Sequence, residues 1–129
     1  MINPRPGVAL VAVEPSGELY FSANIVVTTD ALPTATELER WQDDSDGELE
    51  LRLPDYVLLD RETTADGRVR RLAHYEQPDC GPVTMEQWAW LYDGIGYTIT
   101  ASVATPAYDG LADVFARVAE GFTPGEVRA

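Results

Sequence analysis

Two side chains have the chemistry of a general base or a nucleophile: the single histidine, His74, and the single cysteine, Cys80. An imidazole changes charge near neutral pH, and a thiolate is a strong nucleophile when a base stands beside it. However, His74 falls in the middle of an expected strand, and Cys80 lies in a Pro-Gly loop without an adjacent base. We therefore expect a structural or interface histidine, an incidental thiol and no catalytic residue.

The densest group of carboxylates surrounds Gly47 and consists of Asp43, Asp44, Asp46, Glu48 and Glu50. Calcium binds such oxygens in EF-hand loops, which have glycine at the sixth position and a bidentate glutamate at the twelfth. If Gly47 takes the sixth position, Gln42 takes the first and Leu53 the twelfth, and neither can serve as the required ligand. The spacing indicates a solvated acidic turn, so we expect no metal and no cofactor.

The composition favours one globular domain, residues 1–129, with a net charge of -13. This charge disfavours nucleic acid and anionic membranes, which attract basic surfaces. The apolar run from Val8 to Val13 is too short for a signal peptide or a membrane span, and one cysteine requires no oxidising compartment. We expect a cytoplasmic protein with no nucleic-acid or membrane partner.

Hydrophobic periodicity predicts an α+β fold, with an antiparallel β-sheet of about six strands and a central and a C-terminal helix packed on it. The expected strands cover residues 8–13, 19–29, 56–64, 68–77, 83–92 and 95–103. A helix is expected to begin at Thr34 or Thr36, with Leu38 and Trp41 buried. The acidic stretch weakens this helix, and Leu49, Leu51 and Leu53 alternate as in a strand, so both interpretations remain open up to Pro54. Residues 108–122 have the spacing of an amphipathic helix.

The register of the last hairpin follows from its turn, Asp93-Gly94, the dipeptide typical of a two-residue loop. Trp90 then faces Tyr97 and Trp88 faces Ile99, so the large aromatic side chains share one face of the sheet. We expect the helices to cover that face. The opposite face is expected to be free of helices and to carry mostly small side chains: Gln87, Ala89, Leu91, Thr98, Thr100 and Ser102.

The same rule applied to Asp66-Gly67 pairs Thr63 with Arg70, Arg61 with Leu72, Leu59 with His74 and Leu58 with Tyr75. If Leu58 and Tyr75 belong to the core, the helix-free face also gains Arg61, Arg68, Arg70 and His74. The alternative is that these arginines are solvated strand residues paired with carboxylates.

Several short sequence segments resemble the DcrB-like and LpqN-like domains of the PsbP-like superfamily. They are Phe21-Ser-Ala-Asn-Ile-Val-Val-Thr28, Leu53-Pro-Asp-Tyr-Val-Leu-Leu-Asp60, Gln87-Trp88, Tyr97-Thr-Ile-Thr-Ala101 and Phe122-Thr-Pro. The resemblance covers about residues 18–124. It implies a PsbP-like α/β sandwich used as a non-enzymatic accessory, envelope-associated or chaperone-like factor, including secretion chaperones. The chain lacks the lipobox cysteine of LpqN-like lipoproteins.

These observations predict a binding or chaperone-like domain that captures a protein partner, or a second copy of itself, on the helix-free face. Gln87, Ala89, Leu91, Thr98, Thr100 and Ser102 would form the contact surface, and Arg61, Arg70 and His74 its charged rim. The alternative is a small-molecule-binding protein or a small enzyme, with a pocket between the Trp-rich face and the helices. Tyr97, Trp90 and Glu86 would line that pocket.

Overall fold

The computed structural model describes residues 8–13, 23–78 and 80–121, and of residues 8–13 it describes the backbone only. The elements, in chain order, are β1 (Val8–Val13), β2 (Asn24–Ala31), α1 (Leu38–Arg52), β3 (Val57–Thr63), β4 (Val69–Gln77), β5 (Gly81–Tyr92), β6 (Ile95–Ala104), the 3-10 turn η1 (Thr105–Ala107) and α2 (Tyr108–Gly121). Leu19 and Phe21, expected in the second strand, lie outside the described residues.

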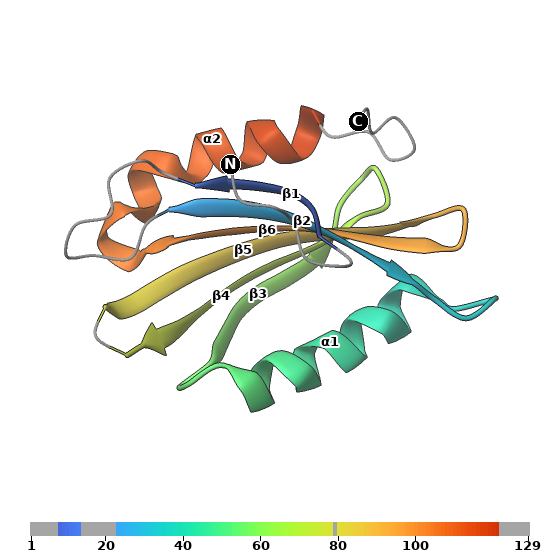
Figure 1. The fold of residues 1–129 in the computed structure, drawn as a ribbon, viewed down its shortest axis with the longest axis horizontal. Helices are drawn as coiled ribbons and strands as arrows, with labels where there is room; N and C mark the ends of the chain where they lie inside the picture. Colours follow the sequence, from blue (N-terminus) through green and yellow to red (C-terminus); the bar gives the residue numbers. More distant parts are fainter. Residues whose placement is uncertain (1–7, 14–22, 79, 122–129) are drawn as a thin grey trace.

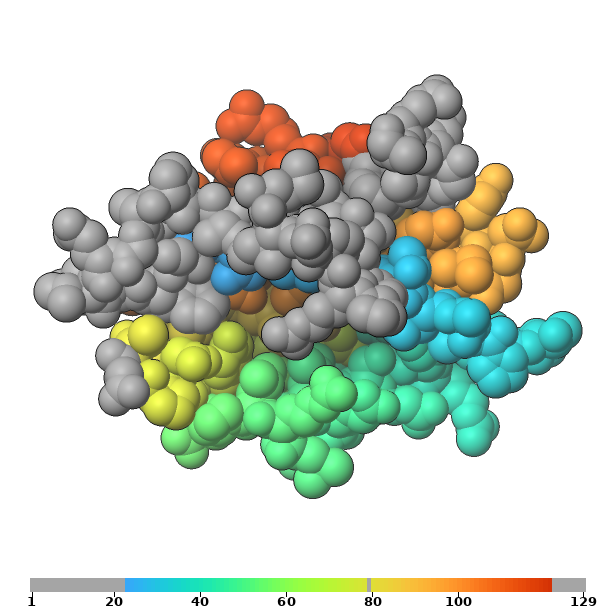
Figure 2. All heavy atoms as spheres, in the orientation of Figure 1, coloured from blue at the N-terminus to red at the C-terminus, as the bar shows by residue number. Residues whose placement is uncertain are grey.

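The strands form one antiparallel sheet in the order β1-β2-β6-β5-β4-β3. The predicted α+β class, an antiparallel sheet with two packed helices, is confirmed. The expectation of a helix-free face is wrong, because α2 lies on one side of the sheet and α1 on the other (Figure 1). Figure 2 shows the same layers, with the α2 segment along the top and the α1 and β3 segments along the bottom.

The burial of strand β5 shows that both faces of the sheet are covered. Its residues from Val83 to Trp90 are all buried, whereas a strand with one wet face alternates between buried and exposed side chains. On one face, Trp88 and Trp90 pack with Ile99 under Phe115 of α2. On the other face, Val83 and Met85 form a smaller cluster with Ala73 and Tyr75, and Leu49, Leu53 and Tyr56 pack against it.

The register of the last hairpin is confirmed. Trp90 lies opposite Tyr97 and Trp88 opposite Ile99. Asp93 and Gly94 have φ values of 52° and 77°, the two positive angles that a type I′ turn requires. The rings of Trp90 and Tyr97 stack with centroids 5.5 Å apart on the α2 side of the sheet.

The predicted register of the β3–β4 hairpin is wrong by one residue. Thr63 pairs with Val69 rather than Arg70, and Arg61 pairs with Arg71 rather than Leu72. The amide of Thr64 donates to the carbonyl oxygen of Arg68 at 2.7 Å, so the loop contains three residues instead of two. Gly67 has the positive φ of 83° that closes such a loop as a bulge.

A second irregularity, between Leu58 and Asp60, shifts the far end of this hairpin. His74 therefore lies opposite Val57 rather than Leu59, and Leu58 lies opposite Ala73 rather than Tyr75.

The acidic stretch does not interrupt α1, which is one helix from Leu38 to Arg52. Leu49 and Leu53 face the sheet one turn apart, while Leu51 is 89% exposed, so the apparent strand alternation was misleading. Gly47 lies in open space on the helix. The start at Leu38 is later than expected, because Thr36 donates its hydroxyl to the carbonyl oxygen of Pro33 and closes a turn there.

Candidate binding site

The six residues predicted to share a face do share one, but it is the face that α1 partly covers. Gln87 lies opposite Thr100, Ala89 opposite Thr98, and Leu91 opposite Gly96. Ser102 lies opposite Met85 on the same side. Ala89, Gln87 and Ser102 are buried, whereas Thr98, Thr100 and Leu91 are only partly buried. The accessible part of this face is therefore its β2–β6 half.

Helix α1 is fixed over the β3–β5 half of that face by a buried arginine. Arg71 of β4 is 1% exposed. Its Nε donates to Asp46 at 2.6 Å, its Nη1 to Oε1 of Gln87 at 2.6 Å, and its Nη2 to the backbone oxygen of Gln42 at 3.1 Å. The Arg71 guanidinium thus links α1 to β5, and it fixes the Gln87 side chain on the α1 side of the sheet.

A second arginine, Arg61 of β3, binds the same helix from the sheet edge. It contacts carboxylate oxygens of Glu39 at 2.9 Å, Asp43 at 2.8 Å and Asp46 at 2.7 Å. Burial lowers the pKa of Arg61, but hydrogen bonds to Asp43 and Asp46 outweigh this effect and raise the pKa above its ordinary value. Asp43 and Asp46 of the acidic stretch therefore anchor α1 to the sheet.

Between α1 and the uncovered half of the face lies an open cavity of about 250 Å³, which we call the α1 groove. Its sheet side is formed by β2, β5 and β6, and its other side by α1. The lining residues are Thr28, Asp30, Trp41, Gln42, Ser45, Glu48, Leu49, Arg52, Gln87, Thr98 and Thr100. Three residues singled out in the sequence, Gln87, Thr98 and Thr100, thus meet in one cavity. The Nε2 of Gln87 donates to the Thr100 hydroxyl at 2.9 Å.

Trp41 forms one end of the α1 groove. A larger, open cavity of about 520 Å³ also has Trp41 in its lining and lies along the segment that joins β2 to α1. The residues that line it are Leu32, Pro33, Thr34, Ala35, Thr36, Glu37, Arg40, Trp41 and Asp44.

Gln42 carries an unusual feature of the α1 groove. The residue is 1% exposed, yet its side-chain Oε1 has no hydrogen-bond partner among the residues that the structure describes. Buried polar atoms in folded proteins are almost always paired, so such an acceptor calls for a specific explanation.

The predicted charged rim is not assembled. Arg70 lies opposite Trp88 and His74 opposite Thr84, which places both on the α2 side of the sheet. Arg61 is on the α1 side, but at the β3 edge and bound to α1. Arg70 and His74 were expected on the other face because Tyr75 was assigned to the Trp-rich core, whereas Tyr75 lies opposite Val83 on the α1 side. The one-residue error in the β3–β4 register separates Arg61 from them, because such a shift moves a side chain to the opposite face.

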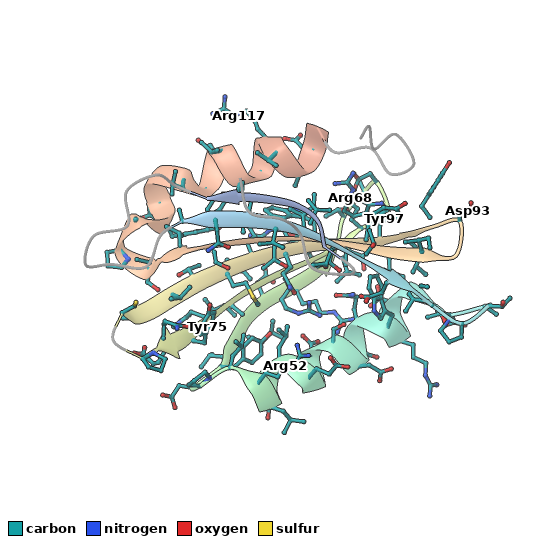
Figure 3. The ribbon with its side chains drawn as sticks, in the orientation of Figure 1. Arg52, Arg68, Tyr75, Asp93, Tyr97 and Arg117 are labelled. Atoms are coloured by element: carbon teal, nitrogen blue, oxygen red, sulfur yellow. The ribbon has the colours of Figure 1, made fainter. Side chains whose placement is uncertain are left out.

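On the α2 side, Glu86 is the centre of a separate polar cluster. Arg70 donates its Nε to Glu86 at 2.6 Å, and the Tyr108 hydroxyl donates to it at 2.9 Å. Burial raises the pKa of Tyr108, and the hydrogen bond to Glu86 raises it further. Figure 3 shows Arg117 on the outer side of α2 pointing away from the sheet, and Tyr75 on the α1 side.

Sequence reasoning missed the α1 wall of the groove. Trp41, Ser45, Glu48 and Arg52 recur at intervals of four, three and four, which places them on one face of a helix. That signal is present in the sequence but is obscured by the acidic stretch, which was expected to weaken the helix and left a helix and a strand both open up to Pro54.

The described residues include no helix long and apolar enough to cross a bilayer. Within the same residues, no group of three or more His, Cys, Asp or Glu side chains is arranged to hold a metal ion.

No known protein family matches the sequence, and no curated protein matches it. Solved structures of similar fold include the following two. PA94 from Pseudomonas aeruginosa, a protein of unknown function, has a TM-score of 0.75 at 12% identity, over 94% of this chain and 85% of that one. The cyanobacterial PsbP protein CyanoP from Synechocystis sp. PCC 6803 has a TM-score of 0.57 at 15% identity, over 91% of this chain and 81% of that one. The chain therefore has a PsbP-like fold, and identities this low show the fold alone.

Proposed function

We propose that this chain is a non-enzymatic binding module, of the accessory or chaperone-like kind, which captures a segment of a partner protein in the α1 groove. The observation that carries the proposal is the partly buried floor of the groove, where Thr28, Thr98 and Thr100 form an open surface beside α1. Small side chains let another backbone approach closely, and hydroxyl groups can donate to or accept from that backbone.

The rigidity of the site supports this proposal. Arg71 fixes Gln87 and α1 relative to the sheet through three hydrogen bonds. A partner segment would therefore meet a preformed surface, which lowers the entropic cost of association. The resemblance of several phrases to DcrB-like and LpqN-like domains also favours an accessory protein, and the cytoplasmic location expected from the sequence is part of this proposal.

The pocket beneath the helices, expected as the alternative site of a small-molecule-binding protein or enzyme, has less support. Trp88 and Trp90 are 7% and 5% exposed and pack with Phe115 as part of the core. Both cavities described above lie on the opposite side of the sheet, beside α1.

The test compares partner capture by the wild-type chain with that of a Thr98→Arg/Thr100→Arg variant, which fills the groove floor with two long side chains. Val114→Arg, an exposed position on α2, is the matched control. Partners are identified by co-purification from the source cell, and molecular mass is measured by light scattering. We expect the double variant to lose the partners, or the self-associated form, that the control retains. Unchanged partners and unchanged mass in the double variant would refute the proposal.

A further inference from the structure

The α1 groove is polarised along its length. Asp30 lies opposite Gly96, and Gly96 lies under Trp41, so Asp30 belongs to the Trp41 end. Gln42 is next to Trp41 in the chain. Arg52 is ten residues further along α1, which is about 15 Å at the rise of a helix. The end at Trp41 is thus acidic and rich in acceptors, and the positive charge lies at the far end.

Resting on the proposed function, we propose that the Trp41 end of the groove takes one cationic side chain of the partner, a lysine or an arginine, with the Gln42 side-chain oxygen as its buried acceptor.

The unpaired oxygen of Gln42 is the first reason. A buried acceptor without a donor is unfavourable, and a donor that arrives with a ligand removes this penalty. The Gln42 backbone oxygen already accepts from Arg71, so the helix at this point is fixed and cannot turn away from the sheet. Because this oxygen is buried, the Gln42 side chain must rotate toward the groove to meet a hydrogen-bond donor that the occupant brings.

The charge of the lining is the second reason. Asp30 lines the groove at its Trp41 end, Glu48 lines it six residues beyond Gln42 along α1, and both side chains are exposed. The chain as a whole carries a net charge of -13, which attracts cations and repels anions over longer distances. These negative charges would repel a carboxylate or phosphate group, which would also offer no hydrogen-bond donor to the Gln42 oxygen.

The size of the groove is the third reason. Sites for whole small molecules occupy about 300–1,000 Å³. The α1 groove, at about 250 Å³, is smaller than that range and suits one long side chain. The alkyl part of lysine or arginine can lie against the ring of Trp41, because such side chains pack their methylene groups on apolar surfaces and keep the charged end hydrated or paired.

The fluorescence of Trp41 can report peptide binding in the α1 groove. It is partly exposed and lines the groove, whereas Trp88 and Trp90 are buried on the α2 side. The probes are three acetylated and amidated peptides, Gly-Ser-Xaa-Ser-Gly, with lysine, norleucine or glutamate at Xaa. Each is titrated into the full chain while tryptophan fluorescence is recorded. We expect the lysine peptide to bind at least about tenfold more tightly than the norleucine peptide, as one charge-assisted hydrogen bond implies. The glutamate peptide should bind most weakly.

Two variants test whether the preference for lysine over norleucine depends on the Gln42 side-chain oxygen. Gln42→Leu removes the acceptor and should reduce the lysine advantage to less than about threefold, whereas Gln42→Glu keeps an acceptor and should preserve it. Circular dichroism verifies that each variant is folded. The comparison of lysine with norleucine on the wild-type chain needs no variant, so it remains decisive if Gln42→Leu does not fold.

Equal affinities of the wild-type chain for lysine and norleucine peptides, or no binding of any of the three, would overturn this inference. The proposed function fails separately, if Thr98→Arg/Thr100→Arg still captures the partner. A chain that loses its partner through that double variant, but shows no lysine preference, keeps the proposed function and loses only this inference.

Discussion

Trp41 of α1 lies so close to Gly96 of β6 that a Cβ atom on Gly96 would come within 2.5 Å of the indole Cη2 atom. The same atom would lie 2.9 Å from Leu32. The absence of a side chain at residue 96 is what allows the indole to rest on the sheet and to close one end of the α1 groove.

Gly96→Ala should therefore destabilise the protein by about 1–3 kcal/mol, the usual cost of forcing an extra carbon into a packed contact. Urea unfolding measures this change. Gly110→Ala in α2 is the matched control, because a Cβ atom there meets nothing within 4 Å, and it should leave stability unchanged or raise it by up to about 1 kcal/mol. In the Trp41→Ala background, the Gly96→Ala penalty should largely disappear. An equal penalty in both backgrounds would show that the contact with Trp41 is not its cause.

The two arginines that hold α1 should differ in importance. Arg71→Met leaves the Gln87 side-chain oxygen and the Gln42 backbone oxygen without this donor in a buried site, so we expect a loss of about 3–5 kcal/mol. Arg61→Met removes contacts to Glu39 and Asp43, whose side chains are largely exposed, and to Asp46, which keeps its bond to Arg71, and it should cost about 1 kcal/mol. Urea unfolding of both variants checks the order, which a larger loss for Arg61→Met would contradict.

Alkaline pH should weaken the fold through Tyr108. The pKa of this residue is raised by burial and by its hydrogen bond to Glu86, so in the folded chain it keeps its proton above pH 10, where the unfolded chain loses it. The unfolded state then binds fewer protons than the folded state, and the free energy of unfolding falls as pH rises above about 10. Tyr56 and Tyr75, whose pKa values burial also raises, act in the same direction.

Tyr108→Phe removes one of these contributions. Its free energy of unfolding should fall less steeply than that of the wild-type chain between pH 9 and 11, by up to about 1.4 kcal/mol per pH unit. Urea unfolding across this pH range measures both slopes. Parallel profiles for the two proteins would rule out this role of Tyr108.

The sequence was most informative where local chemistry determines the structure. Asp93-Gly94 fits a two-residue hairpin, and the register of β5 and β6 follows from it residue by residue. Asp66-Gly67 is the same dipeptide, but Gly67 there closes a longer loop, and this one-residue difference places Arg61 opposite Arg71, on the other face from Arg70 and His74. A dipeptide alone does not distinguish these two loops.

Helix α1 was harder to predict because its partners are distant in sequence. In the sequence alone, Asp43 and Asp46 disfavour a helix. In the structure they bind Arg61, and Asp46 also binds Arg71 from the next strand. For the candidate site, the sheet residues Gln87, Thr98 and Thr100 were identified correctly as sharing a face. The wall formed by Trp41 and Gln42 was not, because it depends on where α1 crosses the sheet.

The most direct test of the proposed function is to map the bound partner onto the chain. Backbone amide shifts of the full chain, labelled with nitrogen-15, are recorded by NMR as the co-purified partner is added. We predict that the largest changes fall on Thr28, Gln87, Thr98 and Thr100 and on the α1 residues around Gln42. Changes confined to α2, or to the exposed edge of β3, would contradict the assignment of the α1 groove as the binding site.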